Sequence, residues 1–103
     1  MNQQILPVEL TITTDGNNHV LHGEVDWNGE GKLLSLNYWY GKRTKKTVIK
    51  QLVGITDLYP GGTEIVSEIN HTWNPGDERE ITYQFVAFDQ EGDYGIDQET
   101  VKL

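Results

Sequence analysis

Turn-forming sequences divide this chain into short segments, and within each segment apolar and polar side chains alternate. Alternation with a period of two is typical of a strand that buries one face, and no window repeats apolar residues with helical spacing. The turns are rich in Gly, Pro, Asn and Asp and recur about every 8–14 residues, as in β-sandwiches and β-barrels. The predicted strands are 8–14, 19–27, 33–40, 47–53, 63–73, 80–88 and 99–103.

Length and composition limit the classes of protein to which the chain belongs. Its 103 residues suffice for one hydrophobic core, and we expect a single domain over residues 1–103. The chain has no cysteine, which excludes disulfides and cysteine-based metal centres. A formal net charge of −8 argues against nucleic acid as a partner. No apolar run approaches the roughly 20 residues that span a bilayer, so we expect no membrane insertion.

The most specific pattern lies near the C-terminus, where a Pro-Gly turn leads into an aromatic and aliphatic strand and then an Ala-x-Asp-x-x-Gly hairpin. The matching residues are Pro75, Gly76, Tyr83, Phe85, Ala87, Asp89 and Gly92. This pattern resembles the end of a fibronectin type III domain or a related bacterial immunoglobulin-like domain, and Trp27 and Tyr38 resemble the core aromatics of such domains. The resemblance implies an immunoglobulin-like β-sandwich of about seven antiparallel strands. It also implies a spacer, an adhesive module or an appendage in a bacterial surface protein or phage particle.

Trp39 is the candidate ligand-binding residue that the strand pattern singles out. Parity places Trp39 on the polar face of segment 33–40, whereas Tyr38 and Tyr40 are expected to point inward. An exposed aromatic side chain can stack on a sugar ring or anchor a protein partner. With Tyr40 or Trp73, it would form a carbohydrate-binding face. The alternative is that Trp39 lies under a loop, within a sheet covered on both faces.

The basic residues of the chain are clustered. Five of the eight lie in the stretch "GKRTKKTVIK" at Lys42, Arg43, Lys45, Lys46 and Lys50. Segment 47–53 alternates poorly, so we expect it at a sheet edge, where lysines block edge-to-edge aggregation. The functional alternative is a binding patch for an anion, such as an acidic polysaccharide, teichoic acid or an acidic protein.

Two groups of side chains invite comparison with metal sites. The stretch "DQEGDYG" places Asp89 in an acidic turn, but the spacing does not fit an EF-hand, and a hairpin turn is the favoured interpretation. His19 and His22 differ by an odd number and face opposite sides of their strand. His22, Glu24 and Asp26 share the outer face, where a solvated strand surface is favoured over a weak metal site. We therefore expect no metal and no cofactor.

No motif for nucleophilic, metal-dependent or phosphate chemistry occurs in the sequence, and no catalytic residues are predicted. The predicted function is a non-catalytic module for adhesion, spacing or ligand contact in a bacterial extracellular or phage structural protein. Its expected partner is a carbohydrate or another protein, at the cell surface or on a virion. Two alternatives stay open: a carbohydrate-binding module that uses exposed aromatic residues, and a small acidic inhibitor of an enzyme.

Overall fold

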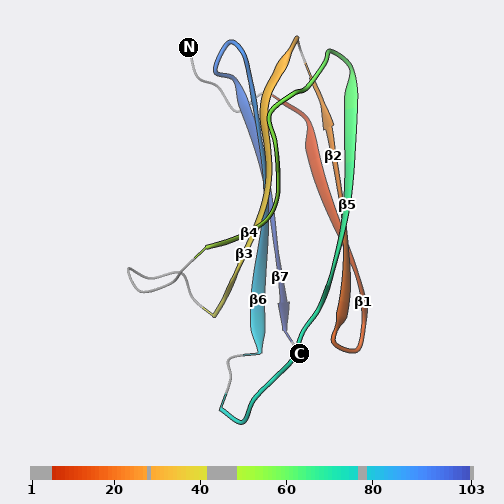
Figure 1. Cartoon of the computed structure of the whole chain (residues 1–103), viewed down its shortest axis with the longest axis vertical. Coiled ribbons are helices and arrows are strands. Elements are labelled where there is room, and N and C mark those ends of the chain that lie inside the picture. The colour runs from red at the N-terminus through yellow and green to blue at the C-terminus, as the bar shows by residue number, and fades with distance from the viewer. Residues whose placement is uncertain (1–5, 28, 42–48, 77–78, 103) are drawn as a thin grey trace.

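The computed structural model describes residues 6–27, 29–41, 49–76 and 79–102, and within these ranges the chain forms seven strands and no helix. Two antiparallel sheets pack face to face (Figure 1), with strand orders β1-β2-β5 and β4-β3-β6-β7. The predicted all-β sandwich is thereby confirmed. The strands are β1 (Val8–Asp15), β2 (Asn18–Asp26), β3 (Gly31–Tyr40), β4 (Lys50–Ile55), β5 (Gly62–Asn70), β6 (Glu80–Asp89) and β7 (Tyr94–Lys102).

Several strand boundaries differ from the sequence prediction, and β4 ends at Ile55 rather than at residue 53. Strand β7 begins at Tyr94 rather than at residue 99, because the hairpin after β6 is tight and pairing resumes at once between Phe88 and Tyr94. Strand β5 ends at Asn70 rather than at Trp73. The connection to β6 therefore begins with side chains that the sequence assigned to a strand.

The core fills the space between the two sheets with the inward side chains of alternating positions. Its fully buried members lie mainly on β2, β3 and β6 and are Leu21, Leu34, Leu36, Ile81, Tyr83, Phe85 and Ala87. Trp27 follows β2, and its indole Nε1 donates a hydrogen bond to Thr63 Oγ1 at 2.7 Å. Both sheets thus contribute to one core, as the inward parity of the segments predicts.

The β1–β2 hairpin turns through two residues, Gly16 and Asn17, between the paired positions Asp15 and Asn18. Gly16 has a φ of 58°, and no residue other than glycine has a positive φ among those described. A two-residue loop with a positive φ only at its first position is a type II′ turn, which favours glycine there. This turn brings His19 to the start of β2, with its side chain in the core.

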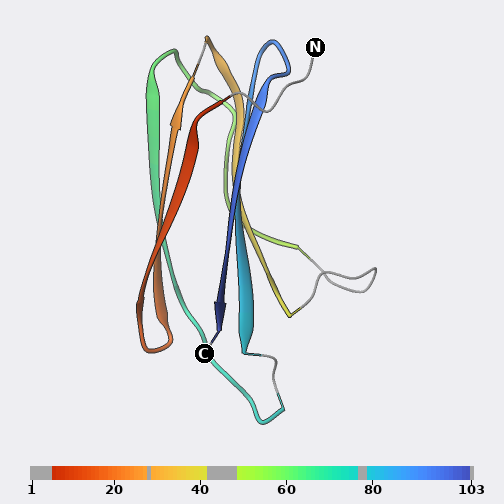
Figure 2. The ribbon, with the colours of Figure 1, turned by 180° about the vertical axis from the view of Figure 1, so that it is seen from behind.

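The edge strands differ between the two sides of the sandwich. On one side, the edge strands β1 and β7 lie next to each other (Figure 2), and the Leu10 backbone N–H donates to Asp97 Oδ2 at 2.8 Å. The Leu6 N–H also donates to the Tyr94 carbonyl at 3.2 Å. On the other side, β4 and β5 are the edge strands, which confirms the edge position expected for the poorly alternating segment.

Candidate functional site

Three aromatic rings gather where β3 ends and the chain leaves β5. Tyr40 is the last residue of β3, and His71 and Trp73 follow β5. The Tyr40 and Trp73 ring centroids lie 5.7 Å apart at 75°, and His71 stacks on Trp73 with centroids 5.4 Å apart. We call these three residues the aromatic end cluster. Tyr40 is 36% exposed, Trp73 is partly buried and His71 is buried, so the cluster presents two rings to solvent over a buried third.

A chain of hydrogen bonds runs from this cluster into the core. The Tyr40 hydroxyl lies 3.1 Å from His71 Nδ1, and His71 Nε2 lies 2.7 Å from the Tyr83 hydroxyl. The same Tyr83 hydroxyl lies 2.7 Å from His19 Nδ1. With both imidazoles neutral, each of these contacts has one donor and one acceptor. An additional proton on either ring would add an N–H donor, which requires a neighbouring hydroxyl to turn and accept or leaves that donor without an acceptor.

Burial shifts the ionisation of His71, His19 and Tyr83 toward the neutral form. Burial and the nearby His19 lower the pKa of His71 from 6.5 to about 4. Burial also lowers the pKa of His19. The pKa of Tyr83 is raised by burial and by the neighbouring Tyr40 and Tyr38 phenols. At neutral pH the network is therefore uncharged and lies beneath the exposed rings.

The Trp73 ring is held in place by more than its stacking on His71. Its Nε1 donates to Asn17 Oδ1 in the β1–β2 turn at 3.1 Å. The His71 backbone N–H donates to the Asn17 carbonyl at 2.8 Å, so one turn residue fixes both ends of the His71–Trp73 pair. A ring held in this way loses little conformational entropy when a ligand stacks on it.

Two cations flank the aromatic end cluster. Lys50 Nζ lies 5.5 Å from the Tyr40 ring centroid, and Arg79 Cζ lies 5.8 Å from that of Trp73. Both distances fall within the range of cation–π attraction. Tyr40 and Lys50 also bracket the segment in which the sequence predicts an anion-binding patch. Its residues Lys42, Arg43, Lys45 and Lys46 lie outside the described residues, and their role stays a prediction.

Trp39 does not lie open on the sheet surface, so the expectation of an exposed ring is wrong and the alternative, a Trp39 covered on that face, is confirmed. Only 4% of its surface is exposed, and the residue opposite it on β6, Thr82, is also buried. The parity argument placed Trp39 on the correct side of β3, because Tyr38 enters the core. Parity identifies a face but not what covers it, and this face is covered at Trp39. Tyr40, which parity placed inward, is exposed at the end of β3, so that expectation is also wrong, and Tyr40 and Trp73 form an accessible pair.

The acidic stretch after β6 is a hairpin turn, as predicted. Asp89 is buried, and its Oδ1 accepts hydrogen bonds from the backbone N–H groups of Glu91 and Asp93, each at 2.9 Å. Gly92 supplies a φ of 86°. The carboxylate of Asp89 therefore closes the turn by bonding to nearby backbone N–H groups, as Asp side chains commonly do in turns.

A second surface lies on the outer face of the β1-β2-β5 sheet. A shallow cavity of about 460 Å³ crosses the three strands there. Four of its lining residues are acidic, namely Glu9, Glu24, Asp26 and Glu64. This surface and the aromatic end cluster have opposite character, because the first is anionic and the second is flanked by cations.

The sequence predicted the exposed aromatic pair in part and missed its support. The sequence predicted Tyr40 and Trp73 each as a partner for Trp39 rather than for each other, and it assigned His71 no role. His71 and Trp73 are two residues apart, and in an extended chain that spacing places both side chains on one face. This parity was the available signal, although only the structure shows that Tyr83 and His19 continue the network.

No protein-family model and no curated protein matches the sequence. Solved structures do match the fold. One is OgpA from Akkermansia muciniphila, with a TM-score of 0.63 at 14% identity over 98% of this chain and 29% of OgpA. Another is catalytically inactive OgpA in complex with an O-glycopeptide substrate, glycodrosocin, with a TM-score of 0.58 at 12% identity over 98% of this chain and 30% of OgpA. The chain thus spans less than a third of OgpA, and the likeness establishes a shared β-sandwich fold. The described part of the chain has no apolar helix long enough to cross a membrane.

Proposed function

We propose that this chain is a non-catalytic, immunoglobulin-like module of a bacterial extracellular or phage structural protein, and that it binds acidic carbohydrate through Tyr40 and Trp73. The observation that carries the proposal is the pair of partly exposed rings 5.7 Å apart, held from below by His71. Sugar rings present C–H faces that pack on aromatic side chains. The angle of 75° between the two rings suits a saccharide that stacks on one ring and touches the edge of the other.

The flanking cations define the class of sugar. Lys50 and Arg79 lie over the rings of Tyr40 and Trp73, so a saccharide that moves these side chains aside to stack would bring its carboxylate or sulfate next to a positive charge. Tyr40 also leads directly into the predicted basic patch at residues 42–46. A uronic acid, sialic acid or sulfated sugar therefore fits this end of the sandwich better than a neutral sugar does.

Two further observations support the proposed non-catalytic module. The fold of nearly the whole chain recurs within OgpA, where it occupies less than a third of the length. OgpA is shown with an O-glycopeptide substrate, which makes O-glycopeptides a sensible first group of ligands to test with this chain. The tyrosine and histidines of the network are held neutral and joined to one another, an arrangement suited to support rather than to proton transfer.

The test is a glycan array followed by calorimetric titration of the oligosaccharides that bind. We expect acidic sugars to be preferred and Trp73→Ala to weaken binding at least about tenfold, the loss typical of an aromatic hot spot. Tyr40→Ala should weaken it similarly. Tyr59→Ala is the matched control, because Tyr59 is 79% exposed and lies outside the cluster.

Two results would contradict the proposal. One is binding that survives both Trp73→Ala and Tyr40→Ala, which would place the ligand elsewhere. The other is the absence of any saccharide that binds, which would favour a spacer or a protein-binding role. Cleavage of an O-glycopeptide by the purified chain would instead refute the non-catalytic part. Thermal melts of each variant separate loss of binding from loss of fold.

A further inference from the structure

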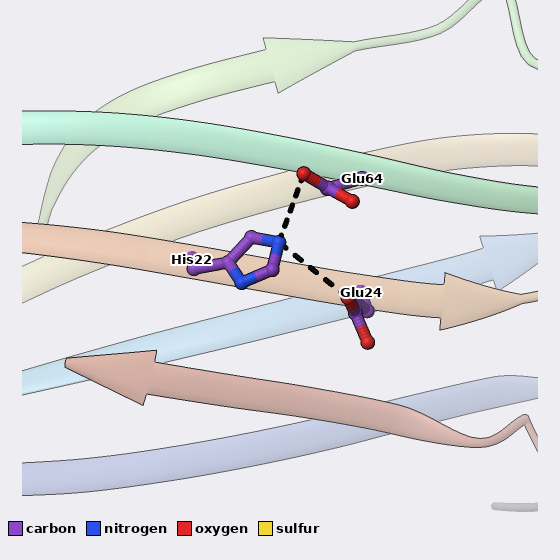
Figure 3. A network of polar contacts seen from close by, with 3 residues as sticks. All are labelled: His22, Glu24 and Glu64. Atoms are coloured by element: carbon purple, nitrogen blue, oxygen red, sulfur yellow. Dashed lines mark ion pairs between the residues drawn. The ribbon is translucent and has the colours of Figure 1, made fainter.

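Three potential metal ligands converge on the outer face of the β1-β2-β5 sheet. His22 and Glu24 lie on β2 and Glu64 lies on β5, with their side chains directed toward one another (Figure 3). His22 Nε2 lies 3.1 Å from Glu64 Oε1 and 3.5 Å from Glu24 Oε1. One donor atom from each residue falls within 4.8 Å of the other two. This cluster is on the face opposite the core and shares no residue with the aromatic end cluster.

Strand register explains how the cluster forms and why it carries excess negative charge. Glu24 pairs directly with Glu9 on β1 and with Glu64 on β5, so three glutamates stand in one row across three strands. All three are exposed on the outer face. Like charges directly opposite each other destabilise a sheet. His22 lies one row along the same face, diagonal to Glu64, and places a nitrogen donor beside the row.

The position of His22 Nε2 is unusual for a surface histidine. This atom has almost no solvent-exposed surface and makes no hydrogen bond to the described residues. Glu64 Oε1 is close enough to Nε2 for a hydrogen bond, so the angle at the ring nitrogen, rather than the distance, is what rules this bond out. The nitrogen thus lies within 3.5 Å of both carboxylates without a hydrogen bond to either.

We propose that His22, Glu24 and Glu64 bind a divalent transition-metal ion of the zinc class. A tetrahedral ion with bonds of about 2.0–2.1 Å holds its donor atoms about 3.3 Å apart. The two nitrogen-to-oxygen distances of 3.1 and 3.5 Å lie on either side of that spacing. Imidazole is a ligand for zinc, copper, nickel and iron, whereas calcium and magnesium take oxygen ligands. The metal would also offset the repulsion within the row of glutamates.

Three protein ligands leave at least one coordination position for another donor. The cavity of about 460 Å³ adjoins the cluster and is lined by both of its carboxylate residues, Glu24 and Glu64. A water molecule, or a donor atom from a ligand that enters the cavity, therefore has access to the metal. A site of this kind is open rather than closed by four protein ligands.

The experiment titrates Zn²⁺ into the purified chain at pH 7 by calorimetry and follows the imidazole nitrogens by NMR. We expect one bound ion, perturbation of His22 Nε2 and a rise in Tm of about 10 °C at a hundredfold excess over Kd. Ca²⁺ and Mg²⁺ should leave Tm unchanged. His22→Gln and Glu64→Gln should each weaken Zn²⁺ binding about 100-fold, because each removes a ligand.

Glu68→Gln is the matched control. Glu68 is exposed on the same face of β5, four residues beyond Glu64, and its replacement removes the same charge without removing a ligand. Zn²⁺ binding should be unchanged in this variant. Equal losses in Glu68→Gln and Glu64→Gln would overturn the proposal by showing only nonspecific attraction to an acidic surface. Absence of a Tm shift with millimolar Zn²⁺, or an unperturbed His22 ring, would also overturn it and leave His22 as an ion-pair partner of the two glutamates.

Discussion

The buried His71 should make the fold sensitive to mild acid. In the folded protein its pKa is about 4 rather than 6.5, first because the ring is buried and second because His19 lies beside it. The folded state therefore holds His71 neutral, whereas the unfolded chain takes up a proton as the pH falls through 6.5. Stability from this residue is fully present above pH 6.5 and is lost progressively down to about pH 4.

The size of the effect follows from the two pKa values. Each unit of pKa difference corresponds to about 1.4 kcal/mol, so His71 accounts for up to about 3 kcal/mol at low pH. Between pH 7 and pH 5 the loss is about 2 kcal/mol. His19 has a pKa lowered by the same cause and acts in the same direction. For a chain of this size, such a change is a large fraction of a typical folding free energy.

Urea denaturation at pH 7, 6 and 5, followed by circular dichroism, measures this loss directly. His71→Gln keeps a polar side chain but removes the ionisable group. It should begin less stable at pH 7, since contacts to Tyr83 and Tyr40 change. Its free energy of unfolding should then fall by about 2 kcal/mol less than that of the native sequence between pH 7 and 5.

His22→Gln is the matched control, because it removes a histidine from the outer face and leaves the buried network intact. If His71→Gln and the native chain lose the same stability between pH 7 and 5, the buried imidazole is not the source of acid sensitivity. The reasoning from burial would then be refuted. A slope that changes only in His22→Gln would refute it as well.

Two other residues give sharp tests of the fold. Trp39→Ala should cost about 3–5 kcal/mol in urea denaturation, as for a buried aromatic ring, and a cost below about 1 kcal/mol would show that Trp39 is exposed after all. Asp89→Ala should cost about 2–3 kcal/mol because two backbone N–H groups lose a charged acceptor. Millimolar Ca²⁺ should leave the Tm of the native chain within about 1 °C, and a calcium-specific rise abolished by Asp89→Ala would contradict the assignment of a simple turn.

The fold was accessible from the sequence because its signals are local. Period-two alternation and glycine-rich turns each depend on neighbouring residues, and they are sufficient to identify seven strands and the inward faces. The tight turn at Gly92 shows the limit of this reasoning. The sequence marked the turn correctly but not the immediate return to pairing at Tyr94, because the residues that follow lack strong alternation.

The candidate sites were harder to predict from the sequence than the fold was, because they depend on contacts between strands. His22 and Glu24 were visible as neighbours on one outer face, but Glu64 reaches them only through the register of β5 against β2. Without that third donor, a solvated strand face was the better interpretation. The network of His71, Tyr83 and His19 likewise joins positions far apart in the chain. The only local sign in the sequence that this network supports Trp73 is the two-residue spacing between His71 and Trp73.

Charge distribution decides how the aromatic end cluster meets an acidic ligand. The net charge of −8 repels an anionic saccharide at long range, whereas Lys50 and Arg79 attract it at contact. At physiological ionic strength, charges more than about 8 Å apart are largely screened from each other. Salt therefore weakens the long-range repulsion by the net charge more than the attraction by Lys50 and Arg79 at contact. Binding of an acidic sugar should therefore strengthen as salt rises from low to physiological concentration. A neutral sugar stacked on the same rings has no charge for either field to act on. The salt dependence of affinity thus separates these two ligand classes at a single site.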